Sequence, residues 1–189
     1  NDVVVYENGK KTSYKSKNIV IATGSSSSSV PGIEINEKNI ISSTGAISLE
    51  KVPKNLVVIG GGYIGLEMGS VWSRLGSEVT VIEYLDHITP GMDREVSKEF
   101  QKILTKQGIK FLLNNKVTKV KDENNKVTVE FSDNSTKAKN IIECEKVLVS
   151  VGRKPYTDGL NLSKIGINKD KQGRIDIDKE FRTSVKNIF

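Results

Sequence analysis

The sequence of 189 residues contains a single cysteine, Cys144, and a single histidine, His87. One cysteine cannot form an internal disulfide or a dithiol redox pair, and it cannot supply a cysteine-rich metal site. We therefore expect no metal and a reducing compartment. No serine, cysteine or carboxylate pattern around His87 indicates catalysis, so we interpret it as a surface residue.

Long hydrophobic runs and dense basic runs are also missing. No apolar run approaches the roughly 20 residues that a membrane span requires, so we expect no membrane insertion. Lysine and arginine outnumber aspartate and glutamate by 29 to 23, which gives a net charge of +6. These charges are interspersed along the chain, which favours a solvated surface over a nucleic-acid site. We predict a soluble globular protein with no nucleic-acid partner.

The most informative stretch runs from Leu56 to Glu83 and reads LVVIGGGYIGLEMGSVWSRLGSEVTVIE. An apolar run typical of a strand buried on both faces precedes a G-x-G-x-x-G motif, and a helical pattern follows it. A second apolar run ends on Glu83, about 20 residues after the motif. The motif glycines are Gly60, Gly62 and Gly65. Strand, glycine turn, helix, strand and terminal acid together predict a dinucleotide-binding βαβ unit.

Each residue type in this unit has a physical reason. Gly60 allows a tight turn, Gly62 lets a pyrophosphate approach the backbone, and Gly65 lets the helix lie close to the sheet. The free N–H groups and the dipole of the helix N-terminus favour phosphate. Glu83 can accept hydrogen bonds from ribose hydroxyls and would repel a 2′-phosphate, and no arginine follows it before Arg94. We therefore predict NAD over NADP, although FAD uses the same fingerprint and a glycine turn can also lack a ligand.

Before this unit, the chain shows shorter signals. Val3–Tyr6 and Asn18–Ile21 read as an antiparallel hairpin around a polar turn. The serines from Ser25 to Ser29 indicate a loop. Ile40–Ser43 and Val52–Pro53 read as a linker.

Two helices are expected in the middle of the chain. In the helix after the glycine turn, one apolar stripe predicts a core face, with Trp72 as a packing residue; the stripe is Ile64, Met68, Val71, Trp72 and Leu75. Asp93 is a candidate N-cap for the next helix, and Gly108 ends it. The apolar positions of that second helix are Val96, Phe100, Ile103 and Leu104.

The remaining segments read as strands. Ile109–Leu113 completes a second βαβ step. Lys116–Lys121 and Lys126–Phe131 flank Asn124-Asn125 as a hairpin, and Val147–Val151 returns to the sheet. Short strands of another domain are expected at Ile165–Ile167 and Ile175–Ile177. The fold class is α/β: a Rossmann-like three-layer NAD-binding domain with a parallel sheet and an antiparallel β-meander.

Four motifs occur in the order found in flavoprotein disulfide reductases: Ala22–Ser25, Gly60–Glu67, Glu83 and Gly152–Pro155. The segments ISSTGAISL, GGGYIGLEMGSVWSRLGSEVTVIE and KQGRIDID are most similar to the dihydrolipoamide dehydrogenase (E3) branch of that family. The resemblance covers essentially the whole chain. It implies that residues 1–33 are the C-terminal part of an FAD-binding domain, 34–152 the NAD-binding domain, and 153–189 the start of a central, FAD-returning segment.

The resemblance also implies site residues. Those that match the NAD site are Gly60, Gly61, Gly62, Tyr63, Ile64, Gly65, Leu66, Glu67, Glu83, Val117 and Gly152. Those that match a contact with FAD are Thr23, Gly24 and Ser25. In the family, the match of Glu67 lies between nicotinamide and flavin, that of Val117 beside the adenine, and that of Gly152 near the nicotinamide. Tyr63 is similar to an aromatic that covers the flavin in some relatives. The residues alone leave Glu67 equally a favourable acid near a helix N-terminus.

The family further implies an enzyme that oxidises protein-bound dihydrolipoamide through a redox disulfide and FAD and reduces NAD⁺ in 2-oxo-acid dehydrogenase complexes. Its partners would be a lipoyl-bearing acyltransferase and a second copy of the enzyme. It would be located in the mitochondrial matrix, in another organelle or in a bacterial cytoplasm. We expect the sequence to be part of a longer protein. The redox C-x-x-x-x-C pair and the catalytic His-Glu pair would lie outside it. We therefore expect the sequence to contain no catalytic residue and only part of the FAD site, and we expect it to catalyse no turnover.

Two other interpretations remain open at this stage. One is the NAD domain of another flavoprotein of the same fold, such as a mercuric, coenzyme A disulfide or NADH-linked reductase. The other is a non-catalytic nucleotide-binding or partner-docking module.

Overall fold

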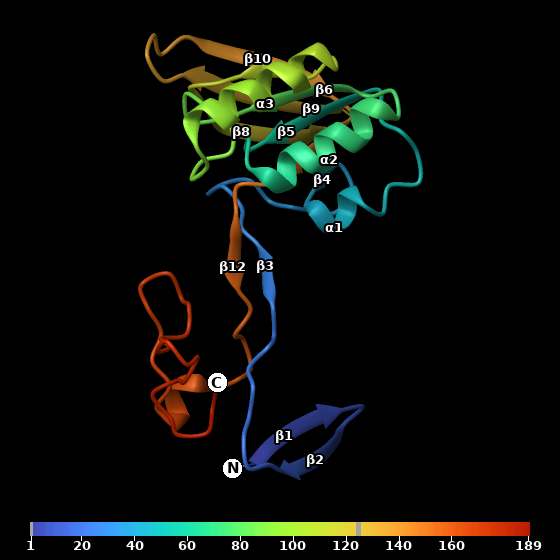
Figure 1. The fold of residues 1–189 in the computed structure, drawn as a ribbon. Coiled ribbons are helices and arrows are strands. Elements are labelled where there is room, and N and C mark those ends of the chain that lie inside the picture. Colours follow the sequence, from blue (N-terminus) through green and yellow to red (C-terminus); the bar gives the residue numbers. More distant parts are fainter. Residues whose placement is uncertain (1, 124–125) are drawn as a thin grey trace. The chain divides into compact units, whose positions relative to one another are not determined.

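The computed structural model describes residues 2–123 and 126–189 (Figure 1). By their contacts these divide into two compact units. The larger unit is Ser27–Gly152, and the smaller one combines the chain up to Ser26 with Arg153–Phe189. Each unit has its own core, and each is described by itself.

The larger unit is built on a five-stranded parallel sheet with the order β4-β11-β5-β6-β7. Its strands are β4 (Ile40–Ile41), β5 (Asn55–Ile59), β6 (Glu78–Ile82), β7 (Lys110–Leu112) and β11 (Lys146–Val149). The helices in its described part are α1 (Ser43–Ala46), α2 (Tyr63–Arg74) and α3 (Arg94–Lys106). An antiparallel meander of β8 (Asn115–Glu123), β9 (Lys126–Asp133) and β10 (Lys139–Cys144) completes it.

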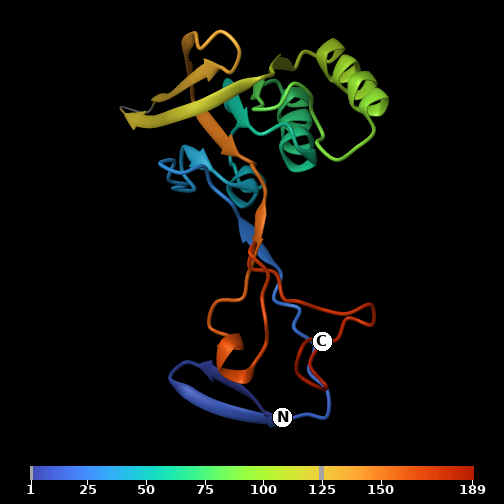
Figure 2. The ribbon, with the colours of Figure 1, turned by 90° about the vertical axis from the view of Figure 1, so that its left-hand side faces the viewer.

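Alternate side chains of the central strands enter two separate cores. Leu56 and Val58 of β5 pack with the helices, whereas Val57 and Ile59 pack with the meander. The helices α2 and α3 thus cover one face of the sheet and the meander covers the other (Figure 2). Parallel strands covered on both faces read as continuous apolar runs, which explains the sequence of β5. The predicted α/β class, with its parallel sheet and antiparallel strands, is confirmed.

The two long helices begin as the sequence predicts. Asp93 is the N-cap of α3, and its side chain accepts hydrogen bonds from the N–H groups of Glu95 and Val96. The glycine turn ends at Gly62, the N-cap of α2. Trp72 is buried, so its predicted packing role is confirmed.

The apolar stripes of these helices are only partly buried, and the predictions for them were partly wrong. On α2 the buried residues are Gly65, Leu66, Gly69 and Trp72. Val71 and Leu75 are exposed, because they lie outside the buried face of α2 that these four residues form. On α3, Val96 and Ile103 are exposed as well, because the buried residues of this helix are Ser97 and Leu104.

Three predictions before β5 were wrong. The partner of β1 (Asp2–Glu7) is β2 (Lys10–Lys15), not Asn18–Ile21. Asn8 and Gly9 have positive φ, and such a two-residue turn fixes the pairing at once. The expected linker contains β4, whose two isoleucines are buried at the sheet edge. The serine stretch contains β3 (Ser25–Ser27), which pairs with β12 (Arg153–Pro155).

The strands after α3 agree better with the sequence. β7 forms the second βαβ step, and β8 pairs with β9 in an antiparallel register. The expected Asn124-Asn125 turn lies outside the described residues. β11 is the predicted returning strand, whereas β10 was not foreseen.

The smaller unit contains β1, β2, β12, the first two residues of β3, and a short 3₁₀ helix at Leu162–Ile165. A small core forms around Leu162, Ile167 and Ile188. The strands expected at Ile165–Ile167 and Ile175–Ile177 are absent from its described residues, apart from one bridge between Lys169 and Ile175. Asp170 and Asp178 instead close turns by accepting backbone N–H groups. Across the described residues, no helix is long and apolar enough to cross a membrane.

Candidate functional site

The candidate site lies where the strand order of the sheet reverses. From β5 the chain moves to β6 and β7 on one side, and it returns to β11 on the other side of β5. In open α/β sheets, ligands bind outside the carboxyl ends of the strands at such a point. The glycine turn follows β5 there, and Ser150 follows β11.

Two motif glycines are required by contacts within the protein. Gly60 has a φ of +105°, and a Cβ there would lie 2.7 Å from the Ser150 carbonyl oxygen. A Cβ on Gly65 would lie 2.5 Å from Ser150 Oγ and 2.9 Å from Val58 Cγ1. These distances are shorter than side chains tolerate, so both positions need glycine to bring α2 onto the sheet.

The third motif glycine has no such reason. Gly62 has a φ of −75°, and a Cβ there would meet no protein atom within 4 Å. Its N–H and those of Tyr63 and Ile64 have no protein acceptor among the described residues. Free N–H groups at an open helix N-terminus are the features that a phosphate requires. The residues present therefore fit the pyrophosphate of a dinucleotide.

Glu83 is in direct contact with the glycine turn. Its Oε2 accepts a hydrogen bond of 2.6 Å from Gly61 N–H, and its Oε1 accepts one of 2.8 Å from Leu85 N–H. The side chain is buried, with 7% of the residue exposed. Each carboxylate oxygen carries two lone pairs, so both can still accept a ribose hydroxyl. The structure thus brings the acid and the phosphate-binding turn together.

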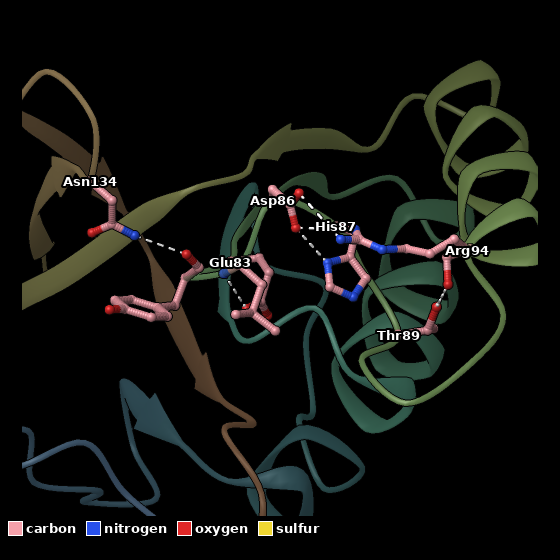
Figure 3. Close-up of polar contacts among 9 residues, drawn as sticks. Glu83, Asp86, His87, Thr89, Arg94 and Asn134 are labelled. Carbon is pink, nitrogen blue, oxygen red and sulfur yellow. Dashed lines mark hydrogen bonds and ion pairs between the residues drawn. The ribbon is translucent and has the colours of Figure 1, made fainter.

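The loop after Glu83 folds back onto the same turn. Thr89 N–H donates to the Gly61 carbonyl oxygen over 2.8 Å. Earlier in the same loop, an Asp86 carboxylate oxygen lies 2.7 Å from His87 Nδ1 and 3.1 Å from an Arg94 nitrogen (Figure 3). The hydrogen bond from Arg94, followed by that from His87, lowers the pKa of Asp86. His87 is half-buried and serves this loop contact.

The other predicted NAD residues take different positions. Tyr63 and Glu67 are exposed on α2, whereas Leu66 and Val117 are buried. The side chain of Val117 lies in the core beneath the meander. Ile64 is partly buried. Gly152 follows β11 with a φ of +127°, and its carbonyl oxygen accepts from Ser28 N–H.

The predicted FAD residues lie in the smaller unit. Tyr156 N–H donates to the Gly24 carbonyl oxygen, and the Thr23 hydroxyl donates to the Tyr156 carbonyl oxygen. Arg153 donates from Nε to Ser25 Oγ and from its terminal nitrogen to the Ser25 carbonyl oxygen, each at 2.6 Å. Two motifs that the sequence analysis found separately are therefore hydrogen-bonded to each other.

A groove of about 990 Å³ lies between α2 and α3. Its apolar lining includes Val71, Met92, Val96 and Ile103, all about half exposed. Glu67, Glu95 and Glu99 add carboxylates. Of the stripe residues outside the core, Val71, Val96 and Ile103 line this groove, whereas Leu75 does not.

Sequence reasoning missed two residues that shape the turn. The single Ser150 O–H lies within hydrogen-bond distance of two carbonyl oxygens, that of Ile59 at 3.0 Å and that of Gly60 at 3.2 Å, which joins the ends of β11 and β5. Thr89 is the other. A polar residue at the end of an apolar run was the available signal for Ser150, whereas nothing local marks Thr89. Among the described residues, no group of three potential metal ligands forms.

The family model for pyridine nucleotide-disulphide oxidoreductases matches residues 1–189. The chain belongs to this family. It is 54% identical over 186 residues to a dihydrolipoamide dehydrogenase from Chaetomium thermophilum, covering 98% of this chain and 37% of that protein. It is 52% identical over 181 residues to a mitochondrial dihydrolipoyl dehydrogenase from Pisum sativum, covering 96% and 36%. The predicted resemblance to this branch is confirmed.

A solved structure of the same family has a similar fold. The HOCl-induced flavoprotein disulfide reductase RclA from Escherichia coli, in a Cu(II) complex, superposes with a TM-score of 0.87 at 28% identity. The match covers all of this chain and 42% of that one. The chain thus spans about a third of the length of the curated relatives described above, 36% and 37%.

Proposed function

We propose that this chain is the NAD-binding portion of a dihydrolipoyl dehydrogenase. The dinucleotide would lie across the carboxyl ends of β5 and β6, with its pyrophosphate on Gly60–Gly65 and its adenosine ribose on Glu83. Val117 would approach the adenine, and Gly152, Tyr63 and Glu67 would lie toward the nicotinamide. Ile64 and Leu66 belong to the same turn of α2 as the phosphate-binding groups.

The observation that carries this proposal is the open space at Gly62. Protein contacts explain Gly60 and Gly65, whereas a Cβ on Gly62 would meet no atom of the described residues within 4 Å, which leaves room for a pyrophosphate to approach its backbone. The contact of Glu83 with Gly61 then favours NAD, because a 2′-phosphate would approach a buried carboxylate held by two N–H groups.

The whole protein would oxidise protein-bound dihydrolipoamide through a redox disulfide and FAD and reduce NAD⁺ to NADH. FAD would supply the two-electron relay between disulfide and nicotinamide. In this chain Thr23, Gly24 and Ser25 would contribute one contact with FAD, and Arg153 would hold Ser25 in place. Residues 1–33 would belong to the FAD-binding domain, 34–152 to the NAD-binding domain, and 153–189 to the following segment.

The assembly and location of the whole protein are proposed from its resemblance to dihydrolipoyl dehydrogenases. We infer a homodimer that receives its substrate from a lipoyl-bearing acyltransferase in a 2-oxo-acid dehydrogenase complex. Curated relatives are named mitochondrial in Pisum sativum and Caenorhabditis elegans, which supports the mitochondrial matrix.

Calorimetric titration of the 189-residue chain with NAD⁺ and with NADP⁺ tests the proposal. We expect NAD⁺ to bind more tightly. A preference for NADP⁺, or no binding of either nucleotide by a folded chain, would overturn it. Because the chain contains only one cysteine, we also expect no lipoamide-dependent NADH formation, and its detection would contradict the assigned role.

A further inference from the structure

Thr89 has an unusual backbone conformation for its residue type. Its φ is +48°, in the left-handed region that β-branched residues rarely adopt. The residue is also buried, with 4% exposed. Strained conformations of this kind persist only where surrounding interactions hold them.

Thr89 makes three hydrogen bonds among the described residues: its carbonyl oxygen accepts one from Met92 N–H over 3.1 Å, and the other two join it to Ser97 and Gly61. Its hydroxyl shares a hydrogen bond of 2.8 Å with Ser97 Oγ, and both groups are buried. Ser97 lies near the start of α3, where its N–H donates to the carbonyl oxygen of the N-cap Asp93. The second bond runs from Thr89 N–H to the Gly61 carbonyl oxygen over 2.8 Å. The first turn of α3 is therefore connected through Thr89 to the glycine turn.

This second bond fixes the direction of the next N–H group. The described chain contains no cis peptide bond, so the peptide between Gly61 and Gly62 is trans and planar. Its C=O and N–H therefore point in opposite directions. With the Gly61 carbonyl directed at Thr89, the Gly62 N–H points away from the loop and has no acceptor among the described residues.

The other side of Gly61 is held as well, because its N–H donates to Glu83 Oε2. Both peptide groups of Gly61 are thus fixed, one by the ribose-binding acid and one by Thr89. Preorganised donors bind an anion without a cost of reordering at the moment of binding.

We propose that Thr89 is a positioning residue for pyrophosphate: held by Ser97, it orients the Gly61–Gly62 peptide so that Gly62 N–H is directed at the ligand. The proposal rests on the nucleotide site proposed above. It distinguishes the two parts of the dinucleotide, because Thr89 would act on the pyrophosphate and Glu83 on the adenosine.

NMR titrations with adenosine and with ADP test this division. In Thr89→Val the hydroxyl is lost while the shape is kept, and we expect ADP affinity to fall about tenfold and adenosine affinity to change less than about twofold. Thr89→Ser keeps the hydroxyl and should restore ADP affinity to near the wild-type value. Equal losses for both ligands, or an unchanged ADP affinity in Thr89→Val, would overturn the proposal.

A ligand-free measurement separates this proposal from the proposed function. Amide hydrogen exchange of Thr89 reports its bond to Gly61 directly. We expect slow exchange in the wild-type chain and faster exchange in Ser97→Ala, with the exchange of Val58 in β5 unchanged. Fast exchange in the wild type would overturn the positioning role even if NAD⁺ binds. Conversely, a folded wild-type chain that binds neither ADP nor NAD⁺ would refute the nucleotide site itself.

Discussion

Gly61 N–H donates a hydrogen bond of 2.6 Å to Glu83 Oε2. The bond joins the turn after β5 to the end of β6, so the two proposed halves of the nucleotide site form one unit. Glu83 consequently has a role in the protein before any ligand arrives: it accepts hydrogen bonds from the buried N–H of Gly61 and from the N–H of Leu85, whose residue is 36% exposed. Substitution of this residue should affect stability and binding together.

Replacement of Glu83 by glutamine should lower both the stability of the chain and its selectivity for NAD⁺. An amide has one acceptor oxygen where the carboxylate has two, so one N–H of the pair faces an NH₂ group. We expect a loss of about 1–3 kcal/mol in the free energy of unfolding and a smaller preference for NAD⁺ over NADP⁺. Urea unfolding and nucleotide titration measure these effects.

The matched control is Glu78→Gln at the other end of β6. Glu78 is exposed and lies 3.8 Å from Lys110. Its replacement should change neither quantity appreciably. Equal effects at both positions would show that the Glu83 contacts contribute nothing specific.

The motif glycines should separate folding from binding. Gly65→Ala places a methyl group 2.5 Å from Ser150 Oγ, so we expect it to destabilise the chain by about 1–3 kcal/mol. Gly62→Ala meets no protein atom, so stability should stay within about 1 kcal/mol of wild type. Its NAD⁺ affinity should nevertheless fall about tenfold or more, because the methyl group occupies the space that the pyrophosphate approaches.

Thermal unfolding and NAD⁺ titration of the two variants check this prediction. Gly69→Ala is the control for a helical glycine, because its added methyl group would lie at an ordinary contact distance of 3.4 Å from Val79. Full NAD⁺ affinity in Gly62→Ala would remove the observation on which the binding site rests.

Cys144 should be inert in the folded chain. Burial raises the pKa of its thiol to about 12 from an ordinary value of 9.0. Because the folded-state pKa is the higher one, the associated stability is present below pH 9 and is lost as the pH rises from about 9 to about 12. A thiol-reactive dye at pH 8 should label the denatured chain rapidly and the native chain slowly; rapid native labelling would contradict the burial of this residue.

Asp93→Ala tests the N-cap of α3, the helix whose Ser97 contacts Thr89 in the loop after Glu83. Asp93 caps α3 through the N–H groups of Glu95 and Val96, so its loss should cost about 1 kcal/mol in urea unfolding. Asp122 is an aspartate on β8 that bonds two asparagine side chains instead of a helix terminus. The Asp93 variant should therefore lose helical circular dichroism at lower urea concentration than Asp122→Ala, and the reverse order would argue against the cap.

Local sequence signals predicted the parts of the fold that depend on local chemistry. The glycine motif, the apolar run of β5 and the Asp93 cap each act within a few residues, and all three were read correctly. Ser25–Ser27 was misread because its strand exists only through pairing with Arg153–Pro155, far along the chain. Val71 and Val96 were misassigned for a related reason: an apolar stripe does not state which part of it meets the sheet.

Local sequence signals likewise predicted only some of the residues of the candidate site. The glycines and Glu83 follow a known spacing, whereas the roles of Ser150 and Thr89 depend on how separate segments meet. No periodicity encodes a threonine that reaches the left-handed region in order to bond Gly61.

The most direct measurement is an NMR titration of the ¹⁵N-labelled 189-residue chain with NAD⁺. We predict that the largest amide shifts occur at Gly61–Gly65 and at Leu85, whose N–H bonds Glu83. Binding that leaves these amides unchanged and shifts others, for example in the groove between α2 and α3, would contradict the account.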